Sequence, residues 1–455
     1  MLYLILIAMV GFTACDDDED AGNTPMNITQ IYLEDADSNI PDRPVIFARL
    51  GQLIRIEGNG FIGLKKIFIN GYETFFNTAL VTDNNIWVSL HEDTPIADAL
   101  PEERNIIRLV KNGAELAHEF VIRAASPQIS SISCTLPKSG QKVKVYGINL
   151  QETTKVILPG DMELTEGIVS DEKGEWYEFT MPAGVTESGS ITSEGANGTA
   201  VTPEYFNEKG AMILDFDGNG TQGFWDWDEE KSMCDSEHDV VDDPLGQNGK
   251  CALLVPQRIL DAGGAVAGKS RIAEWWTAGN DDAADDWNRM TTLIPNDTPL
   301  DEVAFQFDIY VPEPWVQTGH IQISLINSFN ISGIGSDDDG EESLAAFSVP
   351  WIKEGKVVPF STESWQTITI PLSQFNKYAS LIKKGTETDF QLVIDDRNAA
   401  GYRNFGIGFV NTDFTYDGID VTSQTFNQKI YIDNWRIVPC KKTIVSDYPD
   451  EEESE

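Results

Sequence analysis

Alternating apolar and polar residues run through most of the chain. In the first half, Ile54 and Ile56, and later Val143 and Val145, are each separated by one polar residue, and Gly or Asn-Gly interrupts such runs. A period of two residues is typical of strands with one buried face, joined by tight turns. The pattern predicts small β-sandwiches over residues 25–206.

The same pattern occurs twice in this region. Residues 51–58 return as residues 140–147, an offset of 89 positions, and further runs match at the same offset. Copies of this kind indicate one module used twice. We therefore expect a first domain over residues 25–124 and a second over residues 125–206, which act as a spacer ahead of the following domain.

Each copy contains one tryptophan at the equivalent position, Trp87 and Trp176. A large aromatic residue kept at a strand position in both copies is expected to lie in the core rather than to serve as a ligand platform.

The third segment, residues 207–442, alternates in more numerous strands. In residues 304–311, Phe305, Phe307, Ile309 and Val311 share one face, and further strands are expected at 321–325, 367–370, 405–409 and 430–433. Many strands with few helical runs predict an all-β chain, in which two tandem immunoglobulin-like β-sandwiches precede a larger jelly-roll-like sandwich. Residues 443–455 form an acidic tail that we expect to be disordered.

Charge narrows the range of partners. The chain has 74 Asp and Glu against 32 Lys and Arg, a formal net charge of −42. Such a surface repels phosphate backbones, so we expect no nucleic-acid partner. A neutral partner such as a sugar is compatible with this charge.

The N-terminus indicates export. Leu2 to Val10 is an apolar run too short to span a bilayer, and it is followed by small residues directly before Cys15. This order resembles a lipobox, which implies a signal peptide over residues 1–14 and a lipid-anchored Cys15. The acidic linker over residues 15–24 resembles the surface-export signal of Bacteroidetes lipoproteins. We expect a protein displayed on the outer face of the cell outer membrane.

The other cysteines show no metal-binding or redox spacing. Cys134, Cys234, Cys251 and Cys440 form no CxxC pair and have no histidine at ligand spacing. Export permits disulfides, so a Cys234–Cys251 bridge and buried free thiols both remain open.

The third segment is rich in tryptophan, with nine of the eleven in the chain. Flat aromatic rings cover the C–H faces of a sugar ring, and polar side chains bond its hydroxyls. A polysaccharide site therefore needs several aromatic residues with polar residues between them, and this segment can supply both.

Local context selects the candidate ligand platforms. Trp315 and Trp351 lie beside prolines after strands, where loops expose side chains, with core packing as the alternative. Trp287 and Tyr402 are further candidates. Trp275 and Trp276 are adjacent and point to opposite faces of a strand, so at most one of them, Trp276, faces a ligand. Trp435 is expected in the core, whereas Trp365 is as compatible with a structural role as with binding.

These segments together resemble a known family. Gly51 to Gly58 followed by Asn70-Gly71 resembles the immunoglobulin-like TIG fold, and the second copy repeats it. Further along, runs occur in one order that resembles the C-terminal domain of the surface glycan-binding protein B family: residues 214–218, Trp275-Trp276, Trp315, residues 365–375 and residues 431–436. The resemblance implies a SusE/SusF-like lipoprotein that binds a β-glucan or xyloglucan-like polysaccharide. It also implies delivery to a SusC/SusD-type importer encoded in the same polysaccharide utilisation locus.

One loop offers metal-ligand spacing. Asp215, Asp217 and Asn219, with Asp226 at the twelfth position, match the oxygen-ligand spacing of a calcium loop. No cofactor is expected, and a structural calcium at this loop stays open as an alternative. A turn stabilised by Asx hydrogen bonds explains the same residues.

Two other functions compete with glycan binding. A surface glycoside hydrolase needs only two carboxylates about 5–10 Å apart, but no distinctive sequence frame singles out a pair. An adhesin would bind host protein through the TIG-like modules. The tandem spacers and the aromatic-rich last domain favour a non-catalytic glycan-binding protein.

Overall fold

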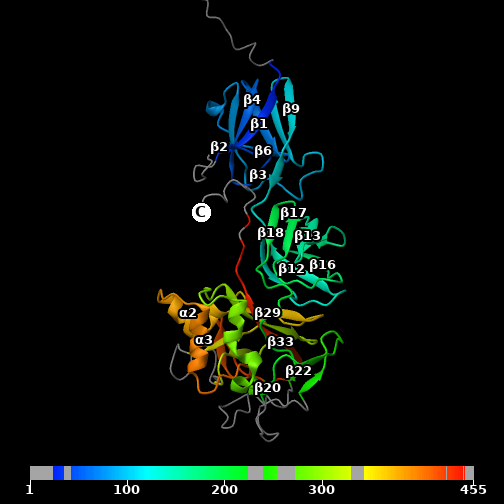
Figure 1. Ribbon diagram of the computed structural model, residues 1–455. Coiled ribbons are helices and arrows are strands. Elements are labelled where there is room, and N and C mark those ends of the chain that lie inside the picture. The colour runs from blue at the N-terminus through cyan, green and yellow to red at the C-terminus, as the bar shows by residue number, and fades with distance from the viewer. Residues whose placement is uncertain are drawn as a thin grey trace, which may run out of the picture. The chain divides into compact units, whose positions relative to one another are not determined.

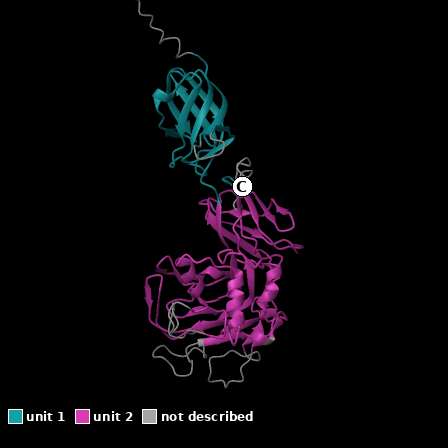
Figure 2. Cartoon of the chain, turned by 60° about the vertical axis from the view of Figure 1, so that its left-hand side comes forward, with its two compact units in different colours: residues 1–127, 196–199, 446–455 teal, residues 128–195, 200–445 magenta. Residues whose placement is uncertain are grey.

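The structure is a computed structural model that describes residues 24–34, 42–223, 239–254, 272–328, 343–426, 428–443 and 445. The chain divides into two compact units, residues 1–127 with 196–199 and 446–455, and residues 128–195 with 200–445 (Figure 2). Strands dominate both units, so the predicted all-β architecture is confirmed. In the described residues, no helix has both the length and the apolar character needed to cross a membrane.

The first unit is an immunoglobulin-like sandwich. One sheet has the order β2-β1-β4-β7, the other has the order β6-β5-β8-β9, and β10 pairs in parallel with β3. Ile54, Ile56, Ile86 and Val88 are buried between the sheets, as the alternation predicts. The strands are β1 (Asn27–Glu34), β2 (Asp42–Pro44), β3 (Phe47–Arg49), β4 (Leu53–Asn59), β5 (Leu64–Ile69), β6 (Tyr72–Thr74), β7 (Asn85–Ser89), β8 (Ile106–Lys111), β9 (Ala114–Glu119) and β10 (Val121–Arg123).

The second immunoglobulin-like module begins the second unit. Its sheets have the orders β11-β12-β16-β15 and β14-β13-β17-β18. Val143, Val145, Tyr177 and Phe179 form the centre of its core. The strands are β11 (Gln128–Ile132), β12 (Lys142–Ile148), β13 (Lys155–Leu158), β14 (Met162–Leu164), β15 (Val169–Ser170), β16 (Trp176–Thr180), β17 (Thr192–Gly195) and β18 (Gly198–Val201).

The repeated tryptophans do not lie in these cores, and that prediction is wrong. Trp87 and Trp176 are only partly buried, because their strand neighbours on either side take the inward positions. The indole N–H of Trp87 donates to Glu34 at 3.2 Å, and the ammonium of Lys144 lies 4.0 Å from the ring centroid of Trp176. Both rings belong to the outer faces of their sheets.

The C-terminal domain is a larger sandwich of two antiparallel sheets (Figure 1). The six-stranded sheet has the order β21-β22-β33-β24-β29, with β19 also pairing with β33, and the five-stranded sheet has the order β20-β23-β30-β25-β26. Phe305, Phe307 and Ile309 point into the core between them, as predicted. Helices α2 (Asn376–Lys383) and α3 (Phe390–Ala399) lie beside the sandwich.

The strands of this domain are β19 (Met212–Leu214), β20 (Gln222–Gly223), β21 (Val240–Asp242), β22 (Lys250–Leu254), β23 (Ile272–Thr277), β24 (Val303–Tyr310), β25 (His320–Ser324), β26 (Ala345–Ser348), β29 (Gln366–Pro371), β30 (Gly406–Val410) and β33 (Ile430–Pro439). Two small hairpins are formed by β27 (Ile352–Lys353) with β28 (Lys356–Val357) and by β31 (Phe414–Tyr416) with β32 (Ile419–Val421).

A polar seam joins the second module to the outer face of the six-stranded sheet. The hydroxyl of Thr135 donates to Gln306 at 2.9 Å and accepts from Arg436 at 2.7 Å. Arg436 also forms a fully buried ion pair with Asp308 at 3.2 Å. Burial, followed by the charge of Asp308, raises the pKa of the nearby Asp433 to about 9. Such a network fixes the module against the sheet, because breaking one partner leaves a buried charge unpaired.

The described cysteines are free thiols. Cys134 and Cys251 are buried and Cys440 is partly buried, and burial raises the pKa of Cys134 to about 12. A thiol with so high a pKa is unreactive near neutral pH. Cys234, the partner considered for Cys251, lies outside the described residues.

Candidate functional site

The five-stranded sheet has one apolar and one polar face. Its inner face packs Trp275, Ile407 and Ile323 into the core. Successive side chains of a strand point to opposite faces, so the residues between them point outward. On this outer face the sheet carries Glu274, Trp276, Gln322, Ser324 and His320, of which none belongs to the core of the sandwich.

Register aligns these side chains in rows. Trp276 lies opposite Gly406 and Gly406 opposite Ser324, so these three form one row. Glu274, Gly408 and Gln322 form the next row, which Phe347 extends on the edge strand β26. Neighbouring strands are about 4.8 Å apart. The two glycines leave the middle strand without side chains in these two rows, with polar and aromatic groups on either side, and Val410 follows opposite His320.

Trp276 is held against this glycine strand. Its indole N–H donates to a carboxylate oxygen of Glu274 at 3.0 Å. A Cβ atom added at Gly406 would lie 2.4 Å from the six-membered ring of Trp276, so only glycine fits at this position. The hydrogen bond to Glu274 and the absence of a side chain at Gly406 both help to position the ring.

His320 adds an unsatisfied polar group to the same face. It is fully buried, and neither of its imidazole nitrogens has a hydrogen-bond partner in the described structure. Burial lowers the pKa of His320 to about 3, which keeps the ring neutral. A neutral imidazole can donate one hydrogen bond and accept another. Unpartnered buried polar atoms are costly, and a ligand that bonds them recovers part of that cost.

The chemistry of this face suits a sugar chain. An indole ring offers a flat apolar surface for the C–H face of a pyranose, while carboxylate, amide and imidazole groups can bond hydroxyls. Among the described outward positions of β23, β25, β26 and β30, Glu274 is the only carboxylate.

Three of the predicted platform residues are part of the core, and the prediction is wrong for them. Trp315, Trp351 and Trp287 are 0%, 1% and 2% exposed and belong to the main hydrophobic cluster. A ring packed on both sides has no face to offer a sugar.

Each of the three indole N–H groups is also satisfied internally. Trp315 donates to the carbonyl of Thr318 at 2.7 Å, Trp351 to the carbonyl of Gly319 at 2.9 Å and Trp287 to Asp285 at 3.1 Å. Backbone bonds in both directions between Trp315 and Phe360 hold the loop against the sandwich, which a proline-flanked sequence does not reveal.

Trp276 and Tyr402 remain candidates. Trp276 is also only 2% exposed, so its ring has no accessible face in this structure. It differs from the other three in lying on the outer side of the sheet, outside the main hydrophobic cluster, while Trp275 takes the core side as expected for adjacent strand residues. Tyr402 is 67% exposed, and its carbonyl accepts a hydrogen bond from the backbone N–H of Asn327. Tyr402 precedes β30, which begins at Gly406, the central residue of the row formed by Trp276, Gly406 and Ser324. Trp435 is fully buried in the core, as predicted.

Sequence reasoning missed Glu274, Gln322 and His320. The signal was present in the strand around residues 321–325, where polar residues alternate with isoleucines. An outward polar residue on a strand is ordinarily solvent-exposed, so alternation alone did not distinguish these side chains from a hydrated surface.

The predicted calcium loop is built as a turn. One carboxylate oxygen of Asp215 accepts from the backbone N–H groups of Asp217 and Asn219, at 3.0 and 2.8 Å, and the other accepts from the Asn219 amide. These bonds form an Asx turn, the alternative to a calcium site at these residues. Asp226 and Cys15 lie outside the described residues. Within the described part of the chain, no three His, Cys, Asp or Glu side chains are placed to hold a metal ion.

The fold and the polar face define a β-sandwich protein whose tandem immunoglobulin-like modules precede a domain with a candidate binding face. The family model for the surface glycan-binding protein B xyloglucan binding domain matches residues 206–439, more than half of the chain. The chain therefore belongs to the surface glycan-binding protein B family, and the resemblance inferred from the sequence is confirmed.

Relatives agree with this assignment. An IPT/TIG domain-containing protein of Bacteroides ovatus is 25% identical over 325 residues, which cover 70% of this chain and 54% of that protein. The chain thus spans about half the length of this curated relative. The crystal structure of surface glycan-binding protein PbSGBP-B from Prevotella bryantii matches with a TM-score of 0.60 and 20% identity, over 92% of this chain and all of the other. This similarity supports the fold.

Proposed function

We propose that this protein captures an extracellular polysaccharide of the xyloglucan or related β-glucan class, without cleaving it, on the outer face of the five-stranded sheet. The observation that carries the proposal is the arrangement of Trp276, Glu274 and Gln322 beside a central strand of glycines. Glu274, Trp276 and Gln322 are at most 2% exposed, so binding requires this face to become accessible to an extended chain, with ring faces against the indole and hydroxyls toward the polar side chains.

Family membership supports the ligand class, because the matched domain is described as xyloglucan-binding. The net charge of −42 favours a neutral glycan over an acidic one. The single carboxylate on the described face favours binding over hydrolysis.

The N-terminal segment supports a location on the cell surface. In this proposal, Cys15 is acylated and anchors the protein to the outer membrane, and the acidic residues 16–20 direct it outward. The immunoglobulin-like modules then act as a spacer, and the captured glycan is passed to a SusC/SusD-type importer.

The proposal is tested by calorimetry and affinity electrophoresis of the purified protein with xyloglucan and mixed-linkage β-glucan. We expect Trp276→Ala to weaken binding at least tenfold, about 1.4 kcal/mol, since a stacked indole contributes on that scale. Trp87→Ala, a partly buried tryptophan of the first module, is the matched control and should bind as the wild type does.

Because the face is buried in this structure, binding should change the environment of Trp276. Titration with an oligosaccharide should therefore change the tryptophan fluorescence of the wild type, and the change should be absent in Trp276→Phe. Equal binding by wild type and Trp276→Ala would remove the face from consideration. Absence of binding to every neutral glycan would reject the function itself.

A further inference from the structure

A groove follows the seam between the second immunoglobulin-like module and the C-terminal domain, within one compact unit. Its main cavity has a volume of about 1090 Å³, and an adjoining cavity of about 490 Å³ shares Ser133, Tyr146, Ser361 and Gln366 with it. The two cavities adjoin at these four residues, and together they are larger than a single sugar requires.

One wall is the outer face of the module's sheet. Lys142, Lys144 and Tyr146 alternate along β12 and so point to the same side, and β16 contributes Glu178. The ammonium of Lys142 lies 2.6 Å from a carboxylate oxygen of Glu178. Tyr146 is 37% exposed and lines both cavities.

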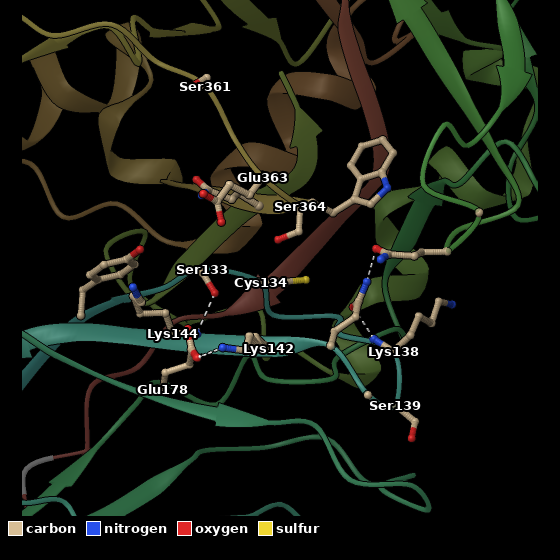
Figure 3. Close-up of a pocket in the computed structure, with 17 residues that line it drawn as sticks. Ser133, Cys134, Lys138, Ser139, Lys142, Lys144, Glu178, Ser361, Glu363 and Ser364 are labelled. Carbon is tan, nitrogen blue, oxygen red and sulfur yellow. Dashed lines mark hydrogen bonds and ion pairs between the residues drawn. The ribbon is translucent and has the colours of Figure 1, made fainter. Parts of the chain in front are cut away.

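The opposite wall is the segment that leads into β29. Figure 3 shows Ser361, Glu363 and Ser364 across the groove from Lys142 and Ser133. The walls are held in place by the seam, where the backbone N–H of Thr367 donates to the carbonyl of Ser133 at 2.8 Å. The groove is therefore built from two connected domains rather than from a loose surface.

The first module shows what this face looks like when it is satisfied internally. There Arg55, at the position equivalent to Lys144, pairs with Glu34, Asp42 and Glu57 at 2.9–3.1 Å. Its Trp87 bonds Glu34. The outward groups of this copy are thus used within the module.

In the second module, the polar atoms of two aromatic side chains on this face form no hydrogen bond within the described structure. In the described structure, neither the hydroxyl of Tyr146 nor the indole nitrogen of Trp176 has a protein hydrogen-bond partner. Burial and the charge of Glu178 raise the pKa of Tyr146, so its hydroxyl remains a donor at neutral pH. An accessible ring, amide and hydroxyl groups and paired charges lie together along the groove.

We propose that this groove is a second carbohydrate-binding site, which takes a neutral oligosaccharide segment with a sugar ring against Tyr146. Gln366 and Ser361 bond its hydroxyls, and the Lys142–Glu178 pair offers one donor group and one acceptor group without a large net charge. The ligand class rests on the proposed function, but the site is separate from the five-stranded sheet. Two sites on one chain would retain a polymer more strongly than either alone.

Calorimetry of the purified full chain with xyloglucan and mixed-linkage β-glucan oligosaccharides tests the second site. Trp276→Ala should retain one weak site, and adding Tyr146→Ala should weaken that site about tenfold or more. Ile148→Ala is the matched control, because Ile148 is exposed on the same side of β12 but outside the groove. It should leave the weak site unchanged.

The outcomes separate the two proposals. If Trp276→Ala alone removes all binding and Tyr146→Ala alone changes neither affinity nor stoichiometry, the second site is rejected and the proposed function stands. If Tyr146→Ala removes binding while Trp276→Ala does not, the groove is the main site and the five-stranded face is rejected. Binding of an oligogalacturonate, but of no neutral oligosaccharide, to the Trp276→Ala variant would overturn the neutral ligand class.

Discussion

The C-terminal sandwich has two buried polar outer faces that differ in how their polar groups are satisfied. On the six-stranded sheet, Asp308 accepts hydrogen bonds from Thr367, Arg436 and Asn434. On the five-stranded sheet, His320 has no partner for either nitrogen in the described structure. Buried polar groups that hydrogen-bond one another hold domains together, whereas buried polar groups without a partner indicate a place for a ligand. The first face is a structural seam, and the second is the candidate binding surface.

The largest expected effect comes from the seam. Arg436→Met leaves Asp308 buried without its cation, and this should lower the free energy of unfolding by about 3–5 kcal/mol. Urea unfolding measures the loss. Lys66→Met removes an exposed pair with Glu73 and should cost about 1 kcal/mol or less. Similar losses for the two variants would contradict the distinction between seam and surface.

Substitutions on the outer face of the five-stranded sheet should weaken glycan binding with little loss of folding stability. Gln322→Leu keeps the side chain's approximate size but removes its amide, and it should weaken glycan binding about tenfold. Its unfolding midpoint should shift less than that of Arg436→Met. Unchanged affinity in calorimetry, with the fold intact, would show that the face does not contact the ligand.

His320, whose ring nitrogens have no hydrogen-bond partner in the described structure, should make the folding stability depend on pH. The unfolded chain takes up a proton on His320 below its ordinary pKa of 6.5, whereas the folded protein does so only near pH 3. Stability is therefore lost as the pH falls from about 6.5 toward 3. The stability of His320→Leu relative to wild type should increase between pH 7 and pH 5, measured by urea unfolding. A constant difference would show that His320 has the same pKa in the folded and unfolded states.

The smallest expected effect concerns the turn at residues 215–219. The carboxylate of Asp215 already accepts three hydrogen bonds within the turn. We expect added calcium, compared with a chelator, to shift the unfolding temperature by less than about 1 °C. A clear calcium-dependent increase that disappears in Asp215→Asn would restore the metal-site prediction.

Local patterns predicted the elements well. Alternation located the strands around Ile54, Val143 and Phe305, and the adjacency of Trp275 and Trp276 predicted that one of them faces the core. These inferences hold because the side-chain direction in a strand depends only on its own backbone. The repeat also predicted one fold for two modules.

The site was harder to predict because burial depends on distant segments. Trp315 lies in a proline-flanked loop, but backbone pairing with Phe360 turns it into the core. Trp87 lies on a strand as expected, but on its outer side. Local sequence gives neither the partner strand nor the face that another sheet covers.

The sequence by itself determined an all-β chain with a tandem repeat, an acidic surface and an aromatic-rich last domain, since composition and period are local properties. Tertiary structure alone decided which outward polar residues bond a neighbouring module and that His320 is buried without a hydrogen-bond partner in the described structure. It brought Thr135 to Arg436 and Trp276 to Gly406, residues far apart in the chain. Long-range strand register makes that selection, because it sets both the partner of each polar group and its access to water.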